Sequence, residues 1–170
     1  ISIKGIKLNV RIQVVMIGII LLTLISFGLG SGFYVENKYN ESNKGLIQEK
    51  IISVGTELGS KLGGEKKLRP ELSDYLEYLL KKFSGIFLTD INLYTPQGDL
   101  LASSQPKIYS EGILSRKMNP EAFEQLQFLE KSEFIHEEQV GTLNYLSAYA
   151  PLFNKQGDML AYLNVQYISR

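Results

Sequence analysis

The sequence predicts an α+β protein: a transmembrane helix that continues into a long helix, then a five-stranded antiparallel sheet with further helices. Three observations predict this class. Residues 12–35 contain no charged side chain. Beyond them, apolar residues recur at steps of three and four, which is the helical period. From about residue 87 onward they alternate with polar residues, which is the period of a half-buried strand. Helices at the front of a domain with antiparallel strands behind them indicate an α+β arrangement.

The uncharged stretch is long enough to cross a bilayer. As a helix it would span about 36 Å, more than the hydrocarbon core requires. Lys4, Lys7 and Arg11 precede the stretch, whereas Glu36 and Lys38 balance each other after it. The positive-inside rule therefore predicts that the N-terminus lies in the cytoplasm.

This orientation predicts three parts: a cytoplasmic tail at 1–11, a transmembrane helix at 12–35, and an extracytoplasmic, periplasmic domain at 36–170, anchored in the inner membrane. A cleaved signal peptide is the alternative, because the small residues Gly30 to Gly32 suit a cleavage site. The apolar run of such a peptide is shorter, at about 7–15 residues.

Gly28 and Gly32 form a GxxxG spacing in the outer part of the span. Small residues at this spacing let two helices approach closely, which favours a homodimer. The alternative is that glycine is simply common in membrane helices.

Two helices are expected before the strands. The first carries one apolar stripe and extends the membrane helix outward until Gly63-Gly64; the stripe is Ile47, Ile51, Val54, Leu58 and Leu62. The second begins after Pro70 and is expected to break at Ser84-Gly85; its apolar side is Leu72, Tyr75, Leu76, Leu79 and Phe83.

The tripeptide Gln-Gly-Asp occurs twice, in "PQGDLL" at 96–101 and in "KQGDML" at 155–160. Each copy lies between stretches rich in β-branched, aromatic and aliphatic residues, so each is expected to be the turn of a β-hairpin. A phosphate-binding loop would need more glycines, a following helix and a lysine at fixed spacing.

Four-residue turns at "TPQG" and "NKQG" would set the register of both hairpins. The expected pairs are Leu93 with Leu100, Ile91 with Ala102 and Asp90 with Ser103 in the first, and Tyr149 with Tyr162, Ser147 with Asn164 and Tyr145 with Gln166 in the second. Each hairpin then has one aliphatic and one polar face. The aliphatic faces are Phe87, Ile91, Leu93, Leu100 and Ala102 in the first, and Leu146, Ala148, Ala150, Ala161, Leu163 and Val165 in the second.

The remaining segments are less regular. A helix is expected after Asn119, which can cap it ahead of Pro120, with Phe123, Leu126 and Phe128 or Leu129 on its apolar side. The strand "EFIHEEQV" should lead through Gly141 into the second hairpin. No clear period marks residues 105–118.

The composition of the chain argues against several classes of function. The 18 basic and 18 acidic residues cancel, so no nucleic-acid partner is expected. Without cysteine and with one histidine, His136, neither a cysteine nucleophile nor a metal site is expected, and no cofactor is predicted. No pair of carboxylates is placed for acid–base catalysis, and neither a phosphoacceptor histidine context nor an ATP-binding glycine motif occurs, so no catalytic residue is assigned.

The sequence resembles the extracytoplasmic PAS-like (Cache or PDC) sensor domains of bacterial sensor histidine kinases and chemoreceptors. The resemblance covers residues 36–167 and is carried by "DINLYTPQGDLLASS" and "APLFNKQGDMLAYLNV". More narrowly, "EGILSRKMNPEAFEQL", "GTLNYLSAYAPL" and "AYLNVQY" are similar to sensor regions of Bacteroidetes-type histidine kinases. The amino-acid-binding signature of Cache domains, an Arg followed by Trp-Tyr, is absent.

In such families the second face of the sheet forms the ligand pocket beneath a loop and a helix. The resemblance therefore implies a small-molecule site on the polar face, at Tyr145, Ser147, Tyr149, Tyr162 and Asn164. Arg116, in the overlying loop at 109–118, could hold a carboxylate of that ligand bidentately. The alternatives are a solvated Arg116 and tyrosines that only pack as cross-strand pairs.

The resemblance implies the membrane-anchored sensor region of a two-component histidine kinase that works as a homodimer. A second membrane span and a kinase module are expected beyond Arg170, because the chain starts without methionine and stops just after a strand. The same fold could serve a chemoreceptor or a cyclic-nucleotide signalling enzyme. A single-span envelope interaction protein without signalling output is a third interpretation.

Overall fold

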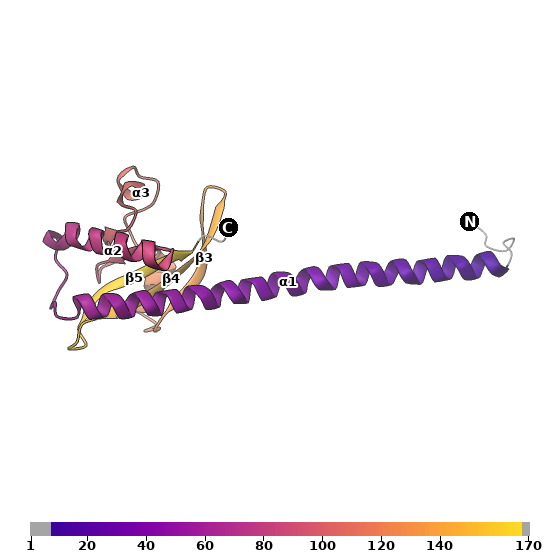
Figure 1. Cartoon of the computed structure of the whole chain (residues 1–170), viewed down its shortest axis with the longest axis horizontal. Coiled ribbons are helices and arrows are strands. Elements are labelled where there is room, and N and C mark those ends of the chain that lie inside the picture. Colours follow the sequence, from indigo (N-terminus) through magenta and orange to yellow (C-terminus); the bar gives the residue numbers. More distant parts are fainter. Residues whose placement is uncertain (1–7, 168–170) are drawn as a thin grey trace. The chain divides into compact units, whose positions relative to one another are not determined.

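The computed structural model describes residues 8–167, except for the side chains of 8, 32, 33 and 35–40. The predicted charges at Lys4, Lys7, Glu36 and Lys38, and Gly32 of the GxxxG spacing, lie outside this description. The elements in chain order are α1 (Leu8–Leu62), the 3₁₀ helix η2 (Pro70–Leu72), α2 (Ser73–Phe87), β1 (Asp90–Tyr94), β2 (Leu100–Ser103), α3 (Pro106–Ser110), α4 (Pro120–Gln127), β3 (Phe134–Val140), β4 (Leu143–Phe153) and β5 (Met159–Tyr167) (Figure 1).

The chain divides into two compact units, Ile1–Ser42 and Asn43–Arg170. In the first unit, Asn9–Ser31 of α1 has a mean hydropathy of 2.5, and none of its side chains is buried. By length and composition, this is the one candidate membrane span among the described residues.

In the second unit, α1 contributes the predicted apolar stripe to the core. All five of its residues are buried, at Ile47, Ile51, Val54, Leu58 and Leu62. The helix ends at Leu62, as predicted, and the amide of Gly63 donates to the carbonyl of Gly59 at 2.8 Å. Since apolar positions three and four apart share one helix face, the stripe orients α1 against the sheet.

The prediction for the second helix is only partly correct. α2 buries Leu76, Leu79 and Phe83, but Leu80 replaces the exposed Tyr75 on the buried side. The helix also continues through Ser84-Gly85 to Phe87. It ends at Leu88, which adopts the left-handed conformation with φ 50°. A single glycine costs a helix only about 1 kcal/mol, and Phe87, packed against the core, offsets that cost.

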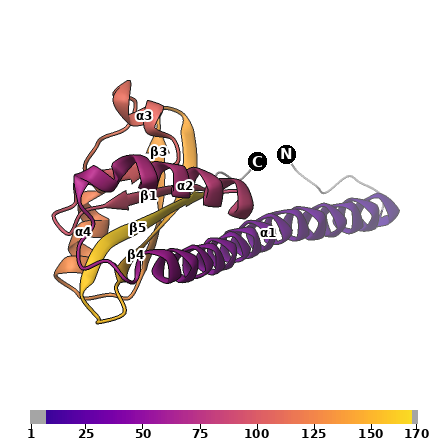
Figure 2. The same cartoon turned by 60° about the vertical axis from the view of Figure 1, so that its left-hand side comes forward.

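The five-stranded sheet has the order β2-β1-β5-β4-β3, and all neighbouring strands are antiparallel. This confirms the predicted α+β class. α2 lies along one face of the sheet (Figures 1 and 2), where its buried side chains join those of α1 and of the strands in one apolar cluster. The buried residues that the strands supply to this cluster are Ile91, Leu93, Ala102, Leu146, Ala148, Leu152, Leu160, Ala161, Leu163 and Val165.

Both Gln-Gly-Asp copies form the same turn. In the first, the amide of Thr95 donates to the carbonyl of Asp99 at 2.7 Å, and that of Gly98 donates to Thr95 at 2.8 Å. In the second, the amide of Asn154 donates to Asp158 at 2.9 Å, and that of Gly157 donates to Asn154 at 3.1 Å. The φ angles of 81° at Gly98 and 87° at Gly157 explain the shared glycine. A five-residue loop therefore replaces each predicted four-residue turn.

The predicted register is wrong by two residues in both hairpins. Leu93 pairs with Ala102 rather than Leu100, and Tyr149 pairs with Asn164 rather than Tyr162. The longer loop and an irregularity beside each turn cause the shift. Because side chains alternate with a period of two, a shift of two leaves almost every residue on its predicted face.

Two residues predicted for the aliphatic face of the first hairpin, Leu100 and Phe87, are placed differently in the structure. The irregularity between Leu93 and Tyr94 turns Leu100 toward the opposite side of the sheet, where it packs near Tyr94. Phe87 does pack against the aliphatic cluster, but it belongs to α2 rather than to a strand.

The last predicted elements are present. β3 and β4 pair from Phe134 with Tyr149 to Val140 with Leu143, leaving a two-residue turn in which Gly141 has φ 60°. In α4, Leu126 is buried and Phe123 packs beneath the helix, whereas Phe128 and Leu129, just after its end at Gln127, are both exposed.

Candidate functional site

The polar face of the sheet has its own small core. Its buried residues are Tyr94, Met118, Ala122, Leu126, Tyr149 and Tyr162. The strands supply the tyrosines, and α4 with the segment before it supplies the other three. α4 and the segment before it therefore form a cover over the polar face. The cover separates part of that face from solvent and leaves another part open.

The segment before α4 is fixed to the first hairpin by backbone hydrogen bonds. The amide of Leu100 donates to the carbonyl of Arg116 at 2.7 Å, and the amide of Met118 donates to Gly98 at 2.8 Å. Asn119 then caps α4, since its side chain accepts from the amides of Glu121 at 2.9 Å and Ala122 at 3.3 Å. Residues 116–119 are thereby held over the sheet.

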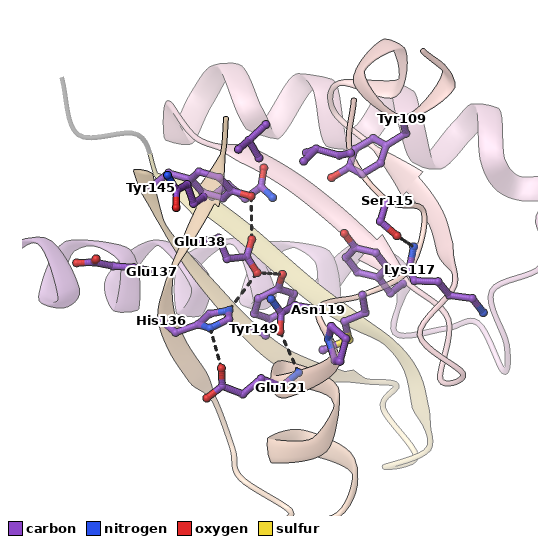
Figure 3. A pocket seen from close by; sticks show the side chains of 17 residues that line it. Tyr109, Ser115, Lys117, Asn119, Glu121, His136, Glu137, Glu138, Tyr145 and Tyr149 are labelled. Atoms are coloured by element: carbon purple, nitrogen blue, oxygen red, sulfur yellow. Dashed lines mark hydrogen bonds and ion pairs between the residues drawn. The ribbon is translucent and has the colours of Figure 1, made fainter. Parts of the chain in front are cut away.

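A cavity of about 450 Å³ lies beneath this cover (Figure 3). Its walls come from β3, β4, the end of β1, Gln166 of β5 and residues 109–121. The lining residues are Tyr94, Tyr109, Leu114, Ser115, Lys117, Met118, Asn119, Pro120, Glu121, His136, Glu137, Glu138, Gln139, Val140, Tyr145, Tyr149 and Gln166. This volume is in the range that holds small-molecule ligands.

Glu138 is the centre of a hydrogen-bond cluster in this cavity (Figure 3). Its Oε1 accepts from the hydroxyl of Tyr149 at 2.6 Å and lies 3.0 Å from Nε2 of His136. Its Oε2 accepts from the hydroxyl of Tyr145 at 2.9 Å. Two neighbouring strands supply all four side chains. His136 and Glu138 come from β3, and Tyr145 and Tyr149 come from β4, where Tyr145 is the direct partner of Glu138.

The electrostatics of the cluster follow from burial and hydrogen bonding. Burial alone would raise the pKa of Glu138, but the hydrogen bonds with His136, Tyr149 and Tyr145 outweigh it and hold that pKa below its usual value. Burial raises the pKa of both Tyr145 and Tyr149, and the negative charge of Glu138 adds to the effect. The carboxylate is therefore charged and the phenols are neutral donors at pH 7.

His136 links Glu138 to the cover. Its Nδ1 lies 3.6 Å from Oε2 of Glu121, the first acidic residue of α4. Its ring is 5.9 Å from that of Tyr149 and 4.8 Å from that of Phe134. Within residues 8–167, no group of three or more His, Asp or Glu side chains is arranged to hold a metal ion.

Two of the six predicted site residues, Tyr145 and Tyr149, line the cavity. Ser147 and Asn164 lie on the same face but are fully buried, and the amide Nδ2 of Asn164 donates to Oγ of Ser147 at 2.7 Å. Tyr162 donates to Gln127 and packs edge-on against Phe123. These last three side chains are outside the cavity wall, so the structure brings together only part of the predicted set.

Arg116 does not line the cavity, and its side chain is exposed. Its role in the fold is carried by its backbone carbonyl, as described above. The cation of the wall is instead the next residue, Lys117, which forms an ion pair with Asp99 and is 67% exposed.

Sequence reasoning missed Glu138, Tyr94 and Tyr109 as residues of the cavity wall. A signal for Glu138 was available, because it lies two residues from His136 and therefore faces the same side of β3. The hairpin through Gly141 pairs it with Tyr145, on the face already predicted to bind ligand. Tyr94 also carried a signal, because it lies two residues from Asn92 on β1 and therefore shares the polar face of that strand. Tyr109 carried none, since residues 105–118 show no period.

The fold is that of extracytoplasmic PAS-like sensor domains. The E. coli DcuS sensor domain superimposes with a TM-score of 0.54 at 11% identity, covering 75% of this chain and 92% of that one. The V. cholerae DctB histidine kinase sensor domain gives 0.48 at 12% identity, over 78% and 55% of the two chains.

A third structure is the ligand-binding domain of the Campylobacter jejuni chemoreceptor Tlp3, solved with 4-methylisoleucine. It gives a TM-score of 0.45 at 10% identity, over 78% of this chain and 52% of that one. The chain thus spans about half the length of the DctB and Tlp3 domains. No protein-family model and no curated protein matches the sequence.

Proposed function

We propose that the protein is the membrane-anchored sensor region of a bacterial signalling receptor and binds a small molecule in the cavity around Glu138. The observation that carries the proposal is the cavity itself, which lies between the sheet and the segment 109–121. It combines a buried charged group, aromatic walls and a volume suited to a metabolite. The PAS-like sensor fold supports the same function.

The proposed output is a two-component histidine kinase acting as a homodimer in the inner membrane. The helix α1 supports this proposal, because it contains both the apolar span and the buried stripe of the sensor unit. A chemoreceptor or a cyclic-nucleotide enzyme would use the same sensor. The sequence that follows Arg170 in the gene decides between them: a second apolar span and a kinase support the proposal, and a methylated signalling domain points to a chemoreceptor.

An envelope interaction protein is the second candidate function, and α2 favours it. Exposed large side chains lie on this helix and just after it, at Tyr75, Tyr78, Ile86 and Leu88. Exposed apolar surface of this kind suits a protein partner. This function needs no ligand in the cavity.

A thermal-shift screen distinguishes the two candidates. The full chain in detergent micelles is heated with a panel of small metabolites, beside pull-downs from envelope extracts. The sensor function predicts a metabolite that raises the melting temperature of the wild type and has less effect on Tyr145→Phe, which loses a cavity hydroxyl. The matched control is Tyr78→Phe on α2, away from the cavity. A protein partner that needs Tyr78, with no response to metabolites, would favour the interaction protein.

A further inference from the structure

We propose that the cavity takes an organic cation, with an ammonium group seated beside Glu138 and among the tyrosines of the wall. The inference rests on the proposed sensor function and names the ligand class. It departs from the carboxylate expected from Arg116, because the side chain of that residue is outside the cavity wall.

The charge of the wall favours a cation. Two carboxylates face the cavity, those of Glu121 and Glu138, whereas Glu137 alternates with Glu138 on β3 and its carboxylate points away (Figure 3). The one ammonium among the lining residues, that of Lys117, is paired with Asp99 and is mostly exposed. A carboxylate ligand would meet like charge, whereas an ammonium would be attracted to the same wall.

Glu138 has room for one further donor. Its side chain is only 11% exposed. Its two oxygens have contacts with three groups, Tyr145, Tyr149 and His136, and a carboxylate offers about four acceptor positions. A buried carboxylate is stabilised most by a full positive charge. An ammonium N–H of the ligand supplies both the missing hydrogen bond and the charge.

Tyr109 is an independent indication of a ligand. It is only 5% exposed, yet within the described residues its hydroxyl has no hydrogen-bond partner of standard geometry. Tyr94 and Gln166 are its polar neighbours, and their hydrogen bonding lowers its pKa against the effect of burial, but the geometry of both contacts falls outside that of a standard hydrogen bond. The hydroxyl points inward, toward the side of the cavity where Glu138 lies (Figure 3). Buried polar groups are nearly always satisfied, so a polar group of the ligand is the expected partner.

The aromatic residues of the cavity wall also favour a cationic ligand. Tyr94, Tyr109, Tyr145 and Tyr149 all line the cavity. The faces of aromatic rings attract cations, and several rings around one site form the kind of cage that binds ammonium groups. The hydroxyls of Tyr145 and Tyr149 already donate to Glu138, so they offer mainly acceptor oxygens to a ligand.

Ligands that differ only in charge test the inference. The probes are 1,4-diaminobutane, succinate and 1,4-butanediol, together with 2-phenylethylamine, phenylacetate and 2-phenylethanol. Each is added to the full chain in micelles at about 10 mM, which detects a Kd of about 1 mM. The expected result is that at least one amine binds, ten times more tightly than the acid and the alcohol of its own set.

Two variants then locate the cation. Glu138→Gln keeps the shape of the side chain and should weaken amine binding at least tenfold. Glu124→Gln, on the exposed side of α4 and outside the cavity, should leave binding unchanged. Tyr109→Phe removes a hydroxyl that has no hydrogen bond of standard geometry in the free protein, so it should weaken binding with little effect on the melting temperature of the free protein. If Glu138→Gln does not fold, Tyr109→Phe still tests whether the amine binds in this cavity.

The outcomes separate the two proposals. Binding of the acids or alcohols in place of the amines, or amine binding unaffected by either cavity variant, would overturn the cationic ligand and leave the sensor function standing. Failure of both amines also overturns it. The sensor function itself fails only if the wider metabolite screen described above also yields nothing.

Discussion

Asn92 of β1 and Asn164 of β5 are direct cross-strand neighbours, and the Nδ2 of Asn92 donates to the Oδ1 of Asn164 at 2.9 Å. The bond is one link in a buried chain of polar side chains across the sheet. Ser103 donates to Oδ1 of Asn92 at 2.7 Å, and Asn164 donates to Ser147 at 2.7 Å. All four side chains are almost wholly inaccessible to solvent.

Removing Asn164 should therefore destabilise the protein strongly. Asn164→Ala leaves the amide of Asn92 and the hydroxyl of Ser147 without their partner, and each unsatisfied buried group costs about 1–3 kcal/mol. We expect the free energy of unfolding in urea, followed by near-ultraviolet circular dichroism, to fall by at least about 2 kcal/mol. Asn144→Ala, at an exposed position of β4, is the control. A fall no larger than that of the control would contradict the prediction.

The two equivalent turns provide a matched pair of glycines. Both Gly98→Ala and Gly157→Ala place a side chain at positive φ, which costs about 1–2 kcal/mol. At Gly98 the new Cβ would also lie 3.2 Å from Cδ2 of Phe123, whereas nothing lies within 4 Å at Gly157. Thermal unfolding should show that both variants are less stable and that Gly98→Ala is the worse. Equal losses would mean that Phe123 moves aside freely.

A glycine in α1 offers a stabilising change. In Gly55→Ala the new Cβ would meet Leu163 at 3.6 Å, an ordinary contact, and alanine favours a helix over glycine by about 1 kcal/mol. We expect a higher melting temperature. Gly63→Ala should lower it, because its Cβ would lie 2.4 Å from the carbonyl oxygen of Gly59. The reverse order would show that α1 ends differently from the structure described here.

Stability should depend on pH through Glu138. Its pKa is lower in the folded protein than the unfolded value of about 4.3, so the stabilisation is complete above about pH 5 and is lost as the pH falls through the folded pKa. The groups that face it are His136, Tyr145 and Tyr149. The difference in unfolding free energy between wild type and Glu138→Gln should therefore shrink below about pH 4. A difference that grows on acidification would refute this assignment.

The proposed topology places Ser2 inside and Ser42 outside the cytoplasmic membrane. Single cysteines introduced at these positions can be treated with an impermeant maleimide in cells whose outer envelope has been permeabilised. We expect labelling at Ser42 alone, because the positive charges before the span favour a cytoplasmic N-terminus. Labelling at Ser2 alone would reverse the topology, and labelling of neither would place the span elsewhere.

Periodic patterns made much of the fold predictable. The stripe from Ile47 to Leu62 and the alternation in the strands depend on burial of one face, which leaves a direct trace in the sequence. The same alternation explains why almost every strand residue lies on its predicted face although the predicted register was wrong by two residues. The loop length did not follow from the sequence, because the five-residue turn depends on the side chains of Thr95 and Asn154, which accept hydrogen bonds from backbone amides inside their own loops.

The candidate site was less predictable than the fold. Tyr145 and Tyr149 could be placed on the correct face by counting along one strand. Whether a side chain on that face meets a cavity or a neighbour depends on the cover, and the cover is an irregular segment. Pairing of residues 116–118 with the first hairpin, which places Lys117 rather than Arg116 in the cavity wall, is a long-range contact with no local signal.

The edge position of β3 has a consequence for how occupancy of the cavity could be measured. β3 carries His136 and Glu138 but pairs with β4 alone, whereas β5 pairs with a strand on each side. Edge amides open more readily than central ones, so they exchange hydrogen for deuterium sooner. A molecule that bridges Glu138 to the opposite wall would hold β3 closed and slow exchange across residues 134–140, while the amides of β5 would change little. Local protection of that one strand would then report binding without any label on the ligand.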